Sequence, residues 1–587
     1  MSADDGDSPY FDDSRRLTGP NLFFRTTGSI LEARGAEAKN PEAHGHWRQL
    51  ARVMCAALEW CDVELISHVH SAITSLVISA PLDQLFTATE VNEWAWLSTV
   101  AKFNPELNIS NATADRPNDV GDIATAMARL SKESAEEHNP PLMDLAAAAA
   151  KHQRTLLVDE EMVSIGGGVG SVSYPLDALP PADQIDWAKV REIPTGLVTG
   201  SNGKTTTVRL IAAIARASQL SPGYSCTEGV FVDGEQLAAG DYSGPAGART
   251  VLRDLRVDCA ILETARGGML RRGLAITHAR VAVVTNVSAD HFGEYGVDSL
   301  EDLADAKLIV AKSLDERGTL VTNADDPVLV RRSEYLWSKL ALFAGDYQHA
   351  LLQKKRQQGG RVCGVENGKL KLFHHQIEHD LGEIDAMPLT VNGSAAYNIA
   401  NISAAVLAAS VLGFSPTIVA RVLSTFGRTR FDNPGRLERW EIHGVQIFVD
   451  YAHNPAGLAG LLTVANRMRT PMAGRLGLLL GQAGNREDED IEALAKTAAS
   501  FTPDLILLKD IDGMLRGREA GEVPAMLRTA LLAAGVKCNQ IAIGESELEA
   551  AKQLVTWAKP GDAVVLPMHN VEARSSMHTW LDTRAAS

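Results

Sequence analysis

The run Thr199–Thr207, TGSNGKTTT, combines glycines, hydroxyl groups and a lysine in an order suited to binding phosphate. The apolar residues Gly196–Val198 before it predict a short buried strand, and Val208, Ile211 and Ile214 after it indicate a helix. A helix that begins after a tight glycine turn presents N–H groups without intrahelical partners, and these groups attract phosphate oxygens. The run therefore predicts a nucleotide phosphate site.

Within this run, Lys204 can place its charge near the β- and γ-phosphates, and the Thr205 hydroxyl can ligate Mg²⁺. Val198 stands where the strict G-x-x-x-x-G-K-[ST] pattern has its first glycine, so an incidental glycine-rich turn is the alternative. The strand before and the helix after favour the phosphate site. The residues that we expect to contact the nucleotide phosphates are Gly200, Ser201, Asn202, Gly203, Lys204, Thr205 and Thr206.

Two further predicted strands end in groups that could bind a metal. Glu263 follows the strand pattern 259–262, and Asp290 and His291 follow the strand pattern 281–285. Alone, each group would more often cap a helix or lie on the surface. Ligands of open α/β sheets bind at the carboxyl ends of the strands, so their position beside a phosphate loop favours Mg²⁺ ligation.

Lys307 lies within a predicted helix, 302–310. Its spacing alone favours a solvated helix face. The alternative is a partly buried lysine near the metals, where burial would lower its pKa and leave a neutral, reactive amine.

Strand and helix patterns alternate over residues 186–388 and again from Pro434. This alternation predicts an α/β fold: a central doubly wound, mostly parallel sheet with the phosphate loop, followed by a Rossmann-like α/β domain. The region before residue 186 has its own helix and strand patterns and predicts an α+β domain. The strands predicted for the central sheet are Gly196–Thr199, Cys259–Leu262, Val281–Thr285 and Thr319–Thr322.

Composition narrows the class of protein. The net charge of −17 argues against a basic nucleic-acid-binding surface. No apolar run is long enough to span a bilayer, and the acidic N-terminus is unlike a secretory signal. The six cysteines show no metal-ligand spacing and read as reduced thiols. These features predict a cytoplasmic protein with no nucleic-acid or membrane partner.

Several motifs resemble a known family. The segments GSNGKTTT, ETARGG, TNVSADHFG and DYAHNPAGL, in this order, resemble the Mur ligase superfamily. Residues 241–245, 248–254 and 516–522 resemble more narrowly the Mur-type region of cyanophycin synthetases, over the span from Asp186 to Leu566. Residues 16–21 are similar to the opening of the cyanophycin synthetase N-terminal domain.

The resemblance implies an ATP-dependent acid–amino-acid ligase that makes an amide or isopeptide bond through an acyl phosphate. The carboxylate would belong to a peptide or polymer, for example to an aspartate side chain, and the amine to a small molecule or amino acid. Catalysis would depend on Lys204, Glu263, His291 and Lys307. Thr205, Ser243 and Glu263 would hold a first Mg²⁺, and His291 with a carbamylated Lys307 would hold a second.

The resemblance also implies the contacts to the rest of ATP. Asn398 and Asn401, three residues apart on one helix face, would reach the adenine. Arg436 would contact ATP from the domain junction, Asp450 would bind the ribose, and Tyr451 and His453 belong to the same loop. Without the resemblance to this family, the two asparagines would be interpreted as ordinary polar residues of a helix, and Asp450 as a helix-capping residue.

The resemblance divides the chain into an acidic tail (1–13), an N-terminal domain resembling a substrate- or polymer-binding domain (14–185), a central ATP-binding domain (186–433) and a C-terminal domain (434–587). The interval from Pro20 to Asp186 is too short for the ATP-grasp module of cyanophycin synthetases, so we expect no polyaspartate-extending activity. Asn485 replaces an expected acid, which could change amine recognition. The chain could form a homo-oligomer. The alternatives are a non-catalytic ATP- or polymer-binding scaffold and, less favoured, a P-loop kinase.

Overall fold

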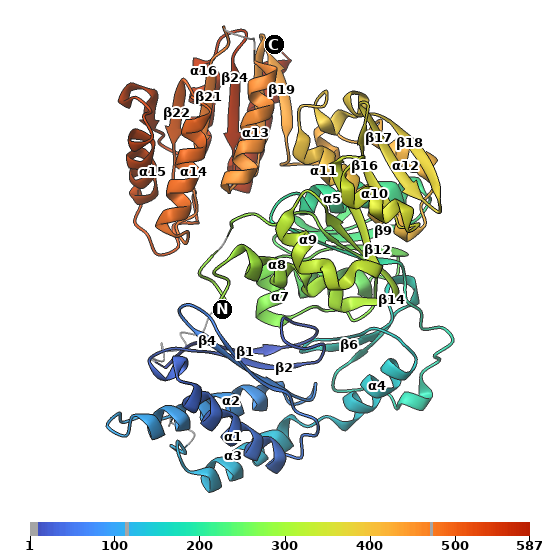
Figure 1. The fold of residues 1–587 in the computed structure, drawn as a ribbon, viewed down its shortest axis with the longest axis vertical. Coiled ribbons are helices and arrows are strands. Elements are labelled where there is room, and N and C mark those ends of the chain that lie inside the picture. The colour runs from blue at the N-terminus through green and yellow to red at the C-terminus, as the bar shows by residue number, and fades with distance from the viewer. Residues whose placement is uncertain (1–9, 112–116, 291, 470–472, 587) are drawn as a thin grey trace.

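The computed structural model describes residues 10–111, 117–290, 292–469 and 473–586. Their strands form four sheets. Figure 1 shows the N-terminal region at one end of the molecule, the large central sheet in the middle and the C-terminal α/β region at the other end. No helix in this described part is long and apolar enough to cross a membrane.

The N-terminal sheet is antiparallel, with the order β1-β2-β4-β3. Its strands are β1 (Phe11–Leu17), β2 (Gly28–Ala33), β3 (Leu65–Val69) and β4 (Thr74–Ser79). The helices that build a core with it are α1 (Pro41–Ala57), α2 (Leu85–Phe103) and α3 (Ile123–Glu137). Trp47, Trp94 and Trp96 are fully buried there, which gives this region a substantial aromatic core of its own.

A small antiparallel sheet connects this region to the central sheet. It consists of β5 (Leu156–Val158), β6 (Met162–Ile165) and β7 (Val172–Pro175), and it follows α4 (Pro140–Lys151). Ile165 packs against Leu145 and Ala149 of α4 in a separate apolar cluster.

The central sheet has the order β11-β10-β9-β12-β8-β13-β14-β15-β16-β17-β18. Its parallel strands are β8 (Thr195–Thr199), β9 (Pro222–Cys226), β12 (Cys259–Glu263), β13 (Ala279–Val284), β14 (Leu314–Asn323), β15 (Leu340–Asp346) and β16 (Val362–Glu366). The antiparallel edge strands are β10 (Gly229–Val232), β11 (Glu235–Ala239), β17 (Lys369–His374) and β18 (Ile377–Glu383). The predicted mostly parallel sheet is therefore confirmed.

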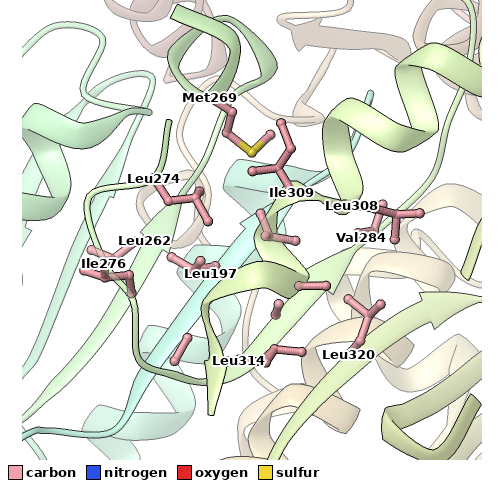
Figure 2. Close-up of a cluster of buried hydrophobic side chains, with 14 of the residues drawn as sticks. Leu197, Leu262, Met269, Leu274, Ile276, Val284, Leu308, Ile309, Leu314 and Leu320 are labelled. Carbon is pink, nitrogen blue, oxygen red and sulfur yellow. The ribbon is translucent and has the colours of Figure 1, made fainter. Parts of the chain in front are cut away.

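Helices cover both faces of the central sheet because its inner strands are apolar on both sides. One face packs against α5 (Lys204–Ala217), α11 (Ala396–Leu412) and α12 (Pro416–Leu423). The other packs against α6 (Pro245–Arg253), α7 (Arg266–Arg272), α8 (Leu300–Leu308), α9 (Pro327–Ser333) and α10 (Ala350–Gln357). Figure 2 shows part of this second core, where Ile309 and Leu308 meet Leu197 and Val284.

The C-terminal sheet has the order β19-β20-β24-β21-β22-β23, parallel except for β19. Its strands are β19 (Glu438–Ile442), β20 (Val445–Asp450), β21 (Leu476–Leu480), β22 (Leu505–Leu508), β23 (Ile541–Ile543) and β24 (Ala563–Pro567). Its helices are α13 (Pro455–Met468), α14 (Asp488–Ser500) and α15 (Glu522–Ala533) on one face, and α16 (Glu547–Trp557) and α17 (Val571–Ala585) on the other. This doubly wound arrangement confirms the predicted Rossmann-like α/β fold.

His374, at the end of β17, makes stability depend on pH. Burial and the charges of Arg361, His375 and His379 lower the pKa of His374 from 6.5 to about 4. Between these values the unfolded chain binds more protons than the folded one, so the free energy of unfolding falls as the pH falls from 6.5 to 4. We expect His374→Leu to flatten the pH dependence in this window, measured by urea denaturation at several pH values. The exposed control His152→Leu should leave it unchanged, and an unchanged slope in His374→Leu would contradict the assignment.

Candidate functional site

The phosphate loop connects β8 to α5, and two of its glycines are required by close approaches. Gly200 has φ +145°, and a Cβ there would lie 1.9 Å from Thr285 Oγ1. Gly203 has φ +86°, and a Cβ there would lie 1.9 Å from Asn401 Oδ1. No side chain caps the first turn of α5, so its N–H groups remain available to an anion.

Lys204 folds back over this loop. Its Nζ donates to the carbonyl oxygens of Gly200 (3.0 Å) and Ser201 (3.1 Å). The backbone N–H groups of Ser201 and Asn202 donate to Asn286, which follows β13. The segment after β13 therefore fixes the shape of the loop.

Thr205 and Glu263 form the part of the site that fits a divalent cation. The Thr205 hydroxyl donates to Glu263 Oε2 at 2.8 Å. Glu263 is 1% exposed, and its other oxygen, Oε1, has no hydrogen-bond partner among the described residues. Burial raises the pKa of Glu263, and the charge of Lys204 opposes this rise. A buried carboxylate oxygen without a partner beside a hydroxyl is a donor set that suits Mg²⁺.

Ser243 is also buried and lines the same cavity. Its hydroxyl donates to Asp241 Oδ1 at 2.6 Å. No group of three His, Cys, Asp or Glu side chains gathers anywhere in the described part of the chain. A cation here would accordingly depend on hydroxyl groups, one carboxylate and the phosphates of its ligand.

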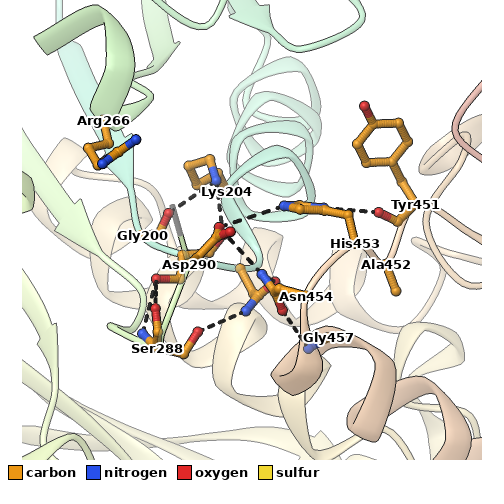
Figure 3. Close-up of polar contacts among 12 residues, drawn as sticks. Gly200, Lys204, Arg266, Ser288, Asp290, Tyr451, Ala452, His453, Asn454 and Gly457 are labelled. Atoms are coloured by element: carbon orange, nitrogen blue, oxygen red, sulfur yellow. Dashed lines mark hydrogen bonds and ion pairs between the residues drawn. The ribbon is translucent and has the colours of Figure 1, made fainter. Parts of the chain in front are cut away.

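The segment after β13 brings Asp290 to the boundary with the C-terminal region, whereas His291 lies outside the described residues. Asp290 accepts from Arg486 Nη1 at 2.9 Å, and its Oδ2 lies 3.7 Å from His453 Nε2. Figure 3 shows Asp290 between Lys204 and His453, with Asn454 directed toward the same carboxylate. Asp290, predicted only as a metal ligand, thus also links the central and C-terminal regions.

Lys307 is buried, with 4% of its surface exposed, so the solvated helix face favoured by spacing is wrong. Burial and the charges of Lys204 and Arg266 lower the pKa of Lys307 well below its ordinary value, while Asp290 acts in the opposite direction. Lys307 lines the same cavity as the phosphate loop. This environment therefore disfavours the charged ammonium form of Lys307.

Asn398 and Asn401 lie on one face of α11 and are buried against the phosphate loop. Asn401 Nδ2 donates to Asn398 Oδ1 at 3.1 Å, and Asn398 Nδ2 donates to the carbonyl of Leu389 at 3.0 Å. The two amides therefore hold each other in a fixed orientation at the cavity wall.

Arg436 and Asp450 lie where the central and C-terminal regions meet. Arg436 lies 4.8 Å from the ring centre of Tyr451, and its Nη2 is 3.3 Å from Thr205 Oγ1. Asp450 Oδ2 accepts from the backbone N–H of Leu437 at 2.6 Å. Desolvation raises the pKa of Asp450, and Arg436 opposes this rise.

Sequence reasoning missed the ion-pair cluster around Glu228. Glu228 is bonded to Arg209, and its Oε1 lies 3.5 Å from Arg436 and 3.7 Å from Arg574. The charges of Arg436, Arg209 and Arg574 lower the pKa of Glu228 against the effect of burial. No local motif marks these residues, because Arg436 and Arg574 lie more than two hundred positions from Glu228 in the sequence.

The phosphate loop, Glu263, Lys307, the two asparagines and Arg436 line one cavity of about 1060 Å³, whereas Glu228 does not belong to its lining. The central and C-terminal regions both contribute to its walls, including Asp450, Tyr451 and His453. A second set of cavity residues was not singled out as site residues by sequence reasoning: Arg266, Arg271, Arg272, Arg486 and Arg516. Asn485 also lines the cavity and accepts from Arg516 at 3.2 Å. The cavity thus combines a phosphate cradle with an arginine-rich wall.

Comparison with known proteins identifies two regions of the chain. Residues 198–409 match the sequence model of the Mur ligase middle domain, and residues 435–567 match that of the Mur ligase glutamate ligase domain. Together these matches cover more than half of the chain.

Two individual relatives also match more than half of this chain. Cyanophycin synthetase of Geminocystis herdmanii is 35% identical over 341 residues, which are 58% of this chain and 38% of that protein. The UDP-N-acetylmuramoyl-L-alanyl-D-glutamate–2,6-diaminopimelate ligase of Corynebacterium efficiens is 29% identical over 63% of this chain and 68% of that protein. The structure of E. coli FolC with DHPP and ADP has a TM-score of 0.48 and 18% identity, over 67% of this chain and 89% of that one. The chain spans about two fifths of the length of the first of these relatives.

Proposed function

We propose that this chain, which belongs to the Mur ligase family, is an ATP-dependent ligase that joins a carboxylate to an amine. One observation carries the proposal: the phosphate loop, the Thr205–Glu263 pair and the buried Lys307 line a single cavity with Asp450 and His453 of the C-terminal region. A cavity lined in this way suits phosphoryl transfer, because the positioning of the reactants and the neutralisation of charge supply most of the catalysis of that reaction.

In this proposal the loop residues 200–206 bind the triphosphate. The N–H groups in the first turn of α5 would donate to phosphate oxygens, and Lys204 would exchange its carbonyl partners for the β- and γ-phosphates. Asn398 and Asn401 lie on the adenine side, and Asp450 and Arg436 on the ribose and phosphate side. His453 and Tyr451 hold the C-terminal wall against the nucleotide.

Thr205, Ser243 and Glu263 would hold one Mg²⁺, and Lys307 in carbamylated form, with His291, would hold a second. Mg²⁺ neutralises phosphate charge when it is bound. A carbamate on Lys307 would replace an amine that lies near Lys204 and Arg266 by an oxygen anion, which suits this cationic surrounding. The neutral amine that burial favours is the form that reacts with carbon dioxide.

The reaction has two displacements. A carboxylate oxygen attacks the γ-phosphorus and ADP leaves, which gives an acyl phosphate. The amine nitrogen then attacks the acyl carbon, the phosphate leaves, and the amine loses a proton to give the amide. The chain's arginine-rich wall, with Arg266 and Arg486, orients the substrate carboxylate at the γ-phosphate side.

Arg266 and Arg486 of this wall pair with Glu294 and Asp290, but Arg271, Arg272 and Arg516 also line the cavity and favour a substrate with more than one negative charge, such as a peptide or polymer that carries aspartate side chains. The N-terminal sheet lies beside α7 of this wall: Thr18 N–H donates to the Arg272 carbonyl, and Leu274 N–H donates to the Pro20 carbonyl. We therefore assign the N-terminal region to holding the substrate. The amine is a small amino acid or related molecule, whose recognition involves Asn485.

An assay with Mg²⁺ and ATP, using aspartate-bearing peptides and other acids with a panel of amino acids and ammonia, tests the proposal. We expect ADP release that depends on both acid and amine, together with a new amide detected by mass spectrometry. Lys204→Ala should lower this turnover by about a hundredfold or more, while the exposed control Lys496→Ala should retain it. A phosphorylated product without an amide would indicate a kinase, and nucleotide binding without turnover across the panel would indicate a scaffold.

A further inference from the structure

A second cavity, of about 630 Å³, lies at the end of the central sheet opposite to the phosphate loop. It opens where β15 and β16 begin, since its walls include Leu340, Ala341 and Arg361. The other walls come from residues 337–339, from the segment after α10, and from the turn between β17 and β18. Figure 1 shows α10, β16 and β17 together on one side of the central region. The volume falls within the range of roughly 300–1,000 Å³ that small-molecule sites occupy.

The charged groups of this cavity are all basic. Lys339, Lys355 and Arg361 line it together with His375, and none of its lining residues within the described chain is an aspartate or glutamate. This is unusual for a protein whose net charge is −17. Such a concentration of one charge in a concave surface attracts small ions of the opposite charge.

In the described part of the chain, the hydrogen bonds of the two lysines go to backbone carbonyls, and Lys355 Nζ also lies 4.9 Å from the ring centre of Trp337. Lys355 Nζ donates to the Trp337 carbonyl at 2.5 Å, and Lys339 Nζ donates to the Asp315 carbonyl at 2.9 Å. Within the described residues neither forms an ion pair with a carboxylate. Each ammonium group has three donors, so both retain donors for a ligand.

Arg361, which is partly buried, shows the same lack of a counter-charge among the described residues. Its Nε is buried and has no hydrogen-bond partner in the described part of the chain. Burial and the nearby charge of Arg280 both lower the pKa of Arg361. No carboxylate of the described residues offsets this effect. A buried guanidinium donor without a partner is costly, and an oxyanion would satisfy it.

The backbone around the cavity is shaped to hold these side chains. A Cβ at Gly360 would lie 2.6 Å from Lys355 Cε, so this glycine makes room for the lysine along the wall. The two-residue turn from β17 to β18 places His375 and Gln376 at φ +50° and +63°. Asn-Gly is the usual choice for such a turn, and a histidine and a glutamine adopt it less readily. The turn thereby brings two polar side chains to the cavity rim.

We propose that this cavity binds a small polyvalent oxyanion, a phosphate ester or a polycarboxylate, at a site separate from the ATP cavity. Arg361 supplies the planar donors that match a phosphate or carboxylate group, and Lys339 and Lys355 supply further positive charges for a second group. His375 and Gln376 close the rim. This inference stands independently of the proposed ligase activity, because it involves none of the groups of the ATP cavity.

Isothermal titration calorimetry of the full chain tests this site with two probes, pyrophosphate and citrate. The titrations use the Lys204→Ala variant, so that the phosphate loop contributes less to binding, and are performed at constant ionic strength. We expect saturable binding of at least one probe, and the stronger binder shows whether phosphate or carboxylate is preferred. Arg361→Gln in this background should weaken the binding by roughly ten- to a hundredfold, as expected for losing a charge-assisted hydrogen bond.

Lys339→Gln, at a less buried position, gives a second variant should Arg361→Gln fold poorly, and it should weaken the same binding. The matched control is Arg317→Gln, an exposed arginine that follows the start of β14 and does not line the cavity. It should bind as the background variant does. Absence of binding by both probes would overturn the proposal. Binding that Arg361→Gln and Lys339→Gln leave unchanged would also overturn it, because the anion would then occupy another site.

Discussion

Lys307→Ala should reduce ligase turnover by about a hundred- to a thousandfold, the loss typical for removing one group that stabilises charge in a transition state. Lys307 is buried in the wall of the ATP cavity, where the charges of Lys204 and Arg266 act on it. The measurement is the initial rate of ADP release with acid and amine present. The affinity for ATP should change much less, since the phosphate loop is untouched.

Rescue distinguishes a carbamylated lysine from an ordinary buried one. Added bicarbonate, formate or acetate should partly restore turnover in Lys307→Ala, because a small carboxylate can enter the space left by the side chain. Lys307→Arg is the matched control: it fills the space with a positively charged side chain and cannot form the carbamate, so it should stay inactive with the same additives. Full activity of Lys307→Ala without these additives would show that Lys307 takes no part in the reaction.

The second large effect concerns the stability of the C-terminal region. Lys509 and Glu547 form an ion pair in which both side chains are 0% exposed. Glu547 also accepts from the N–H groups of His569 (2.9 Å) and Asn570 (3.0 Å). Glu547→Gln would leave Lys509 as an uncompensated buried charge. We expect the free energy of unfolding of this region to fall by about 3–5 kcal/mol, measured by urea denaturation.

Two further variants distinguish the loss of this ion pair from a general loss of stability. Glu547→Gln combined with Lys509→Met should recover part of the lost stability, because the unpaired charge is removed. Glu492→Gln, which breaks the exposed pair with Lys496, should cost less than about 1 kcal/mol. A loss in Glu547→Gln no larger than in Glu492→Gln would contradict the account.

The buried pair is also connected to the ATP cavity. His569 Nε2 lies 3.0 Å from the Ala452 carbonyl, and Ala452 lies between Tyr451 and His453 in the proposed nucleotide-facing loop. Loss of the pair should therefore loosen this loop and raise the KM for ATP.

Local sequence patterns were sufficient for the inner strands β8, β12 and β13 of the central sheet and for the second half of β14, but not for β9 or β15. The strand β21 begins and ends where its apolar run, Leu476–Leu480, begins and ends, since a strand buried on both faces consists of apolar residues throughout. The phosphate loop was equally predictable, because its glycines, its lysine and the elements around it are consecutive in the chain.

Other features depend on contacts between distant segments and could not be predicted. The helical spacing around Lys307 is the same for a solvated and a buried lysine, and only the packing of α8 beside the phosphate loop decides between them. The helix predicted over 302–310 is α8, which ends at Leu308 and gives way to a 3₁₀ turn, Ile309–Ser313. The individual strands of the N-terminal sheet were largely missed; its β2–β4 pair joins strands that α1 separates, whereas short loops connect β1 to β2 and β3 to β4.

The central claim, that a carboxylate attacks the γ-phosphate of ATP, is tested most directly with an acid whose carboxylate is labelled with ¹⁸O. An acyl phosphate transfers one carboxylate oxygen to the inorganic phosphate that leaves when the amine attacks. We predict that the released phosphate carries one ¹⁸O atom for each amide formed, as measured by mass spectrometry. Amide formation with unlabelled phosphate would contradict the proposed reaction.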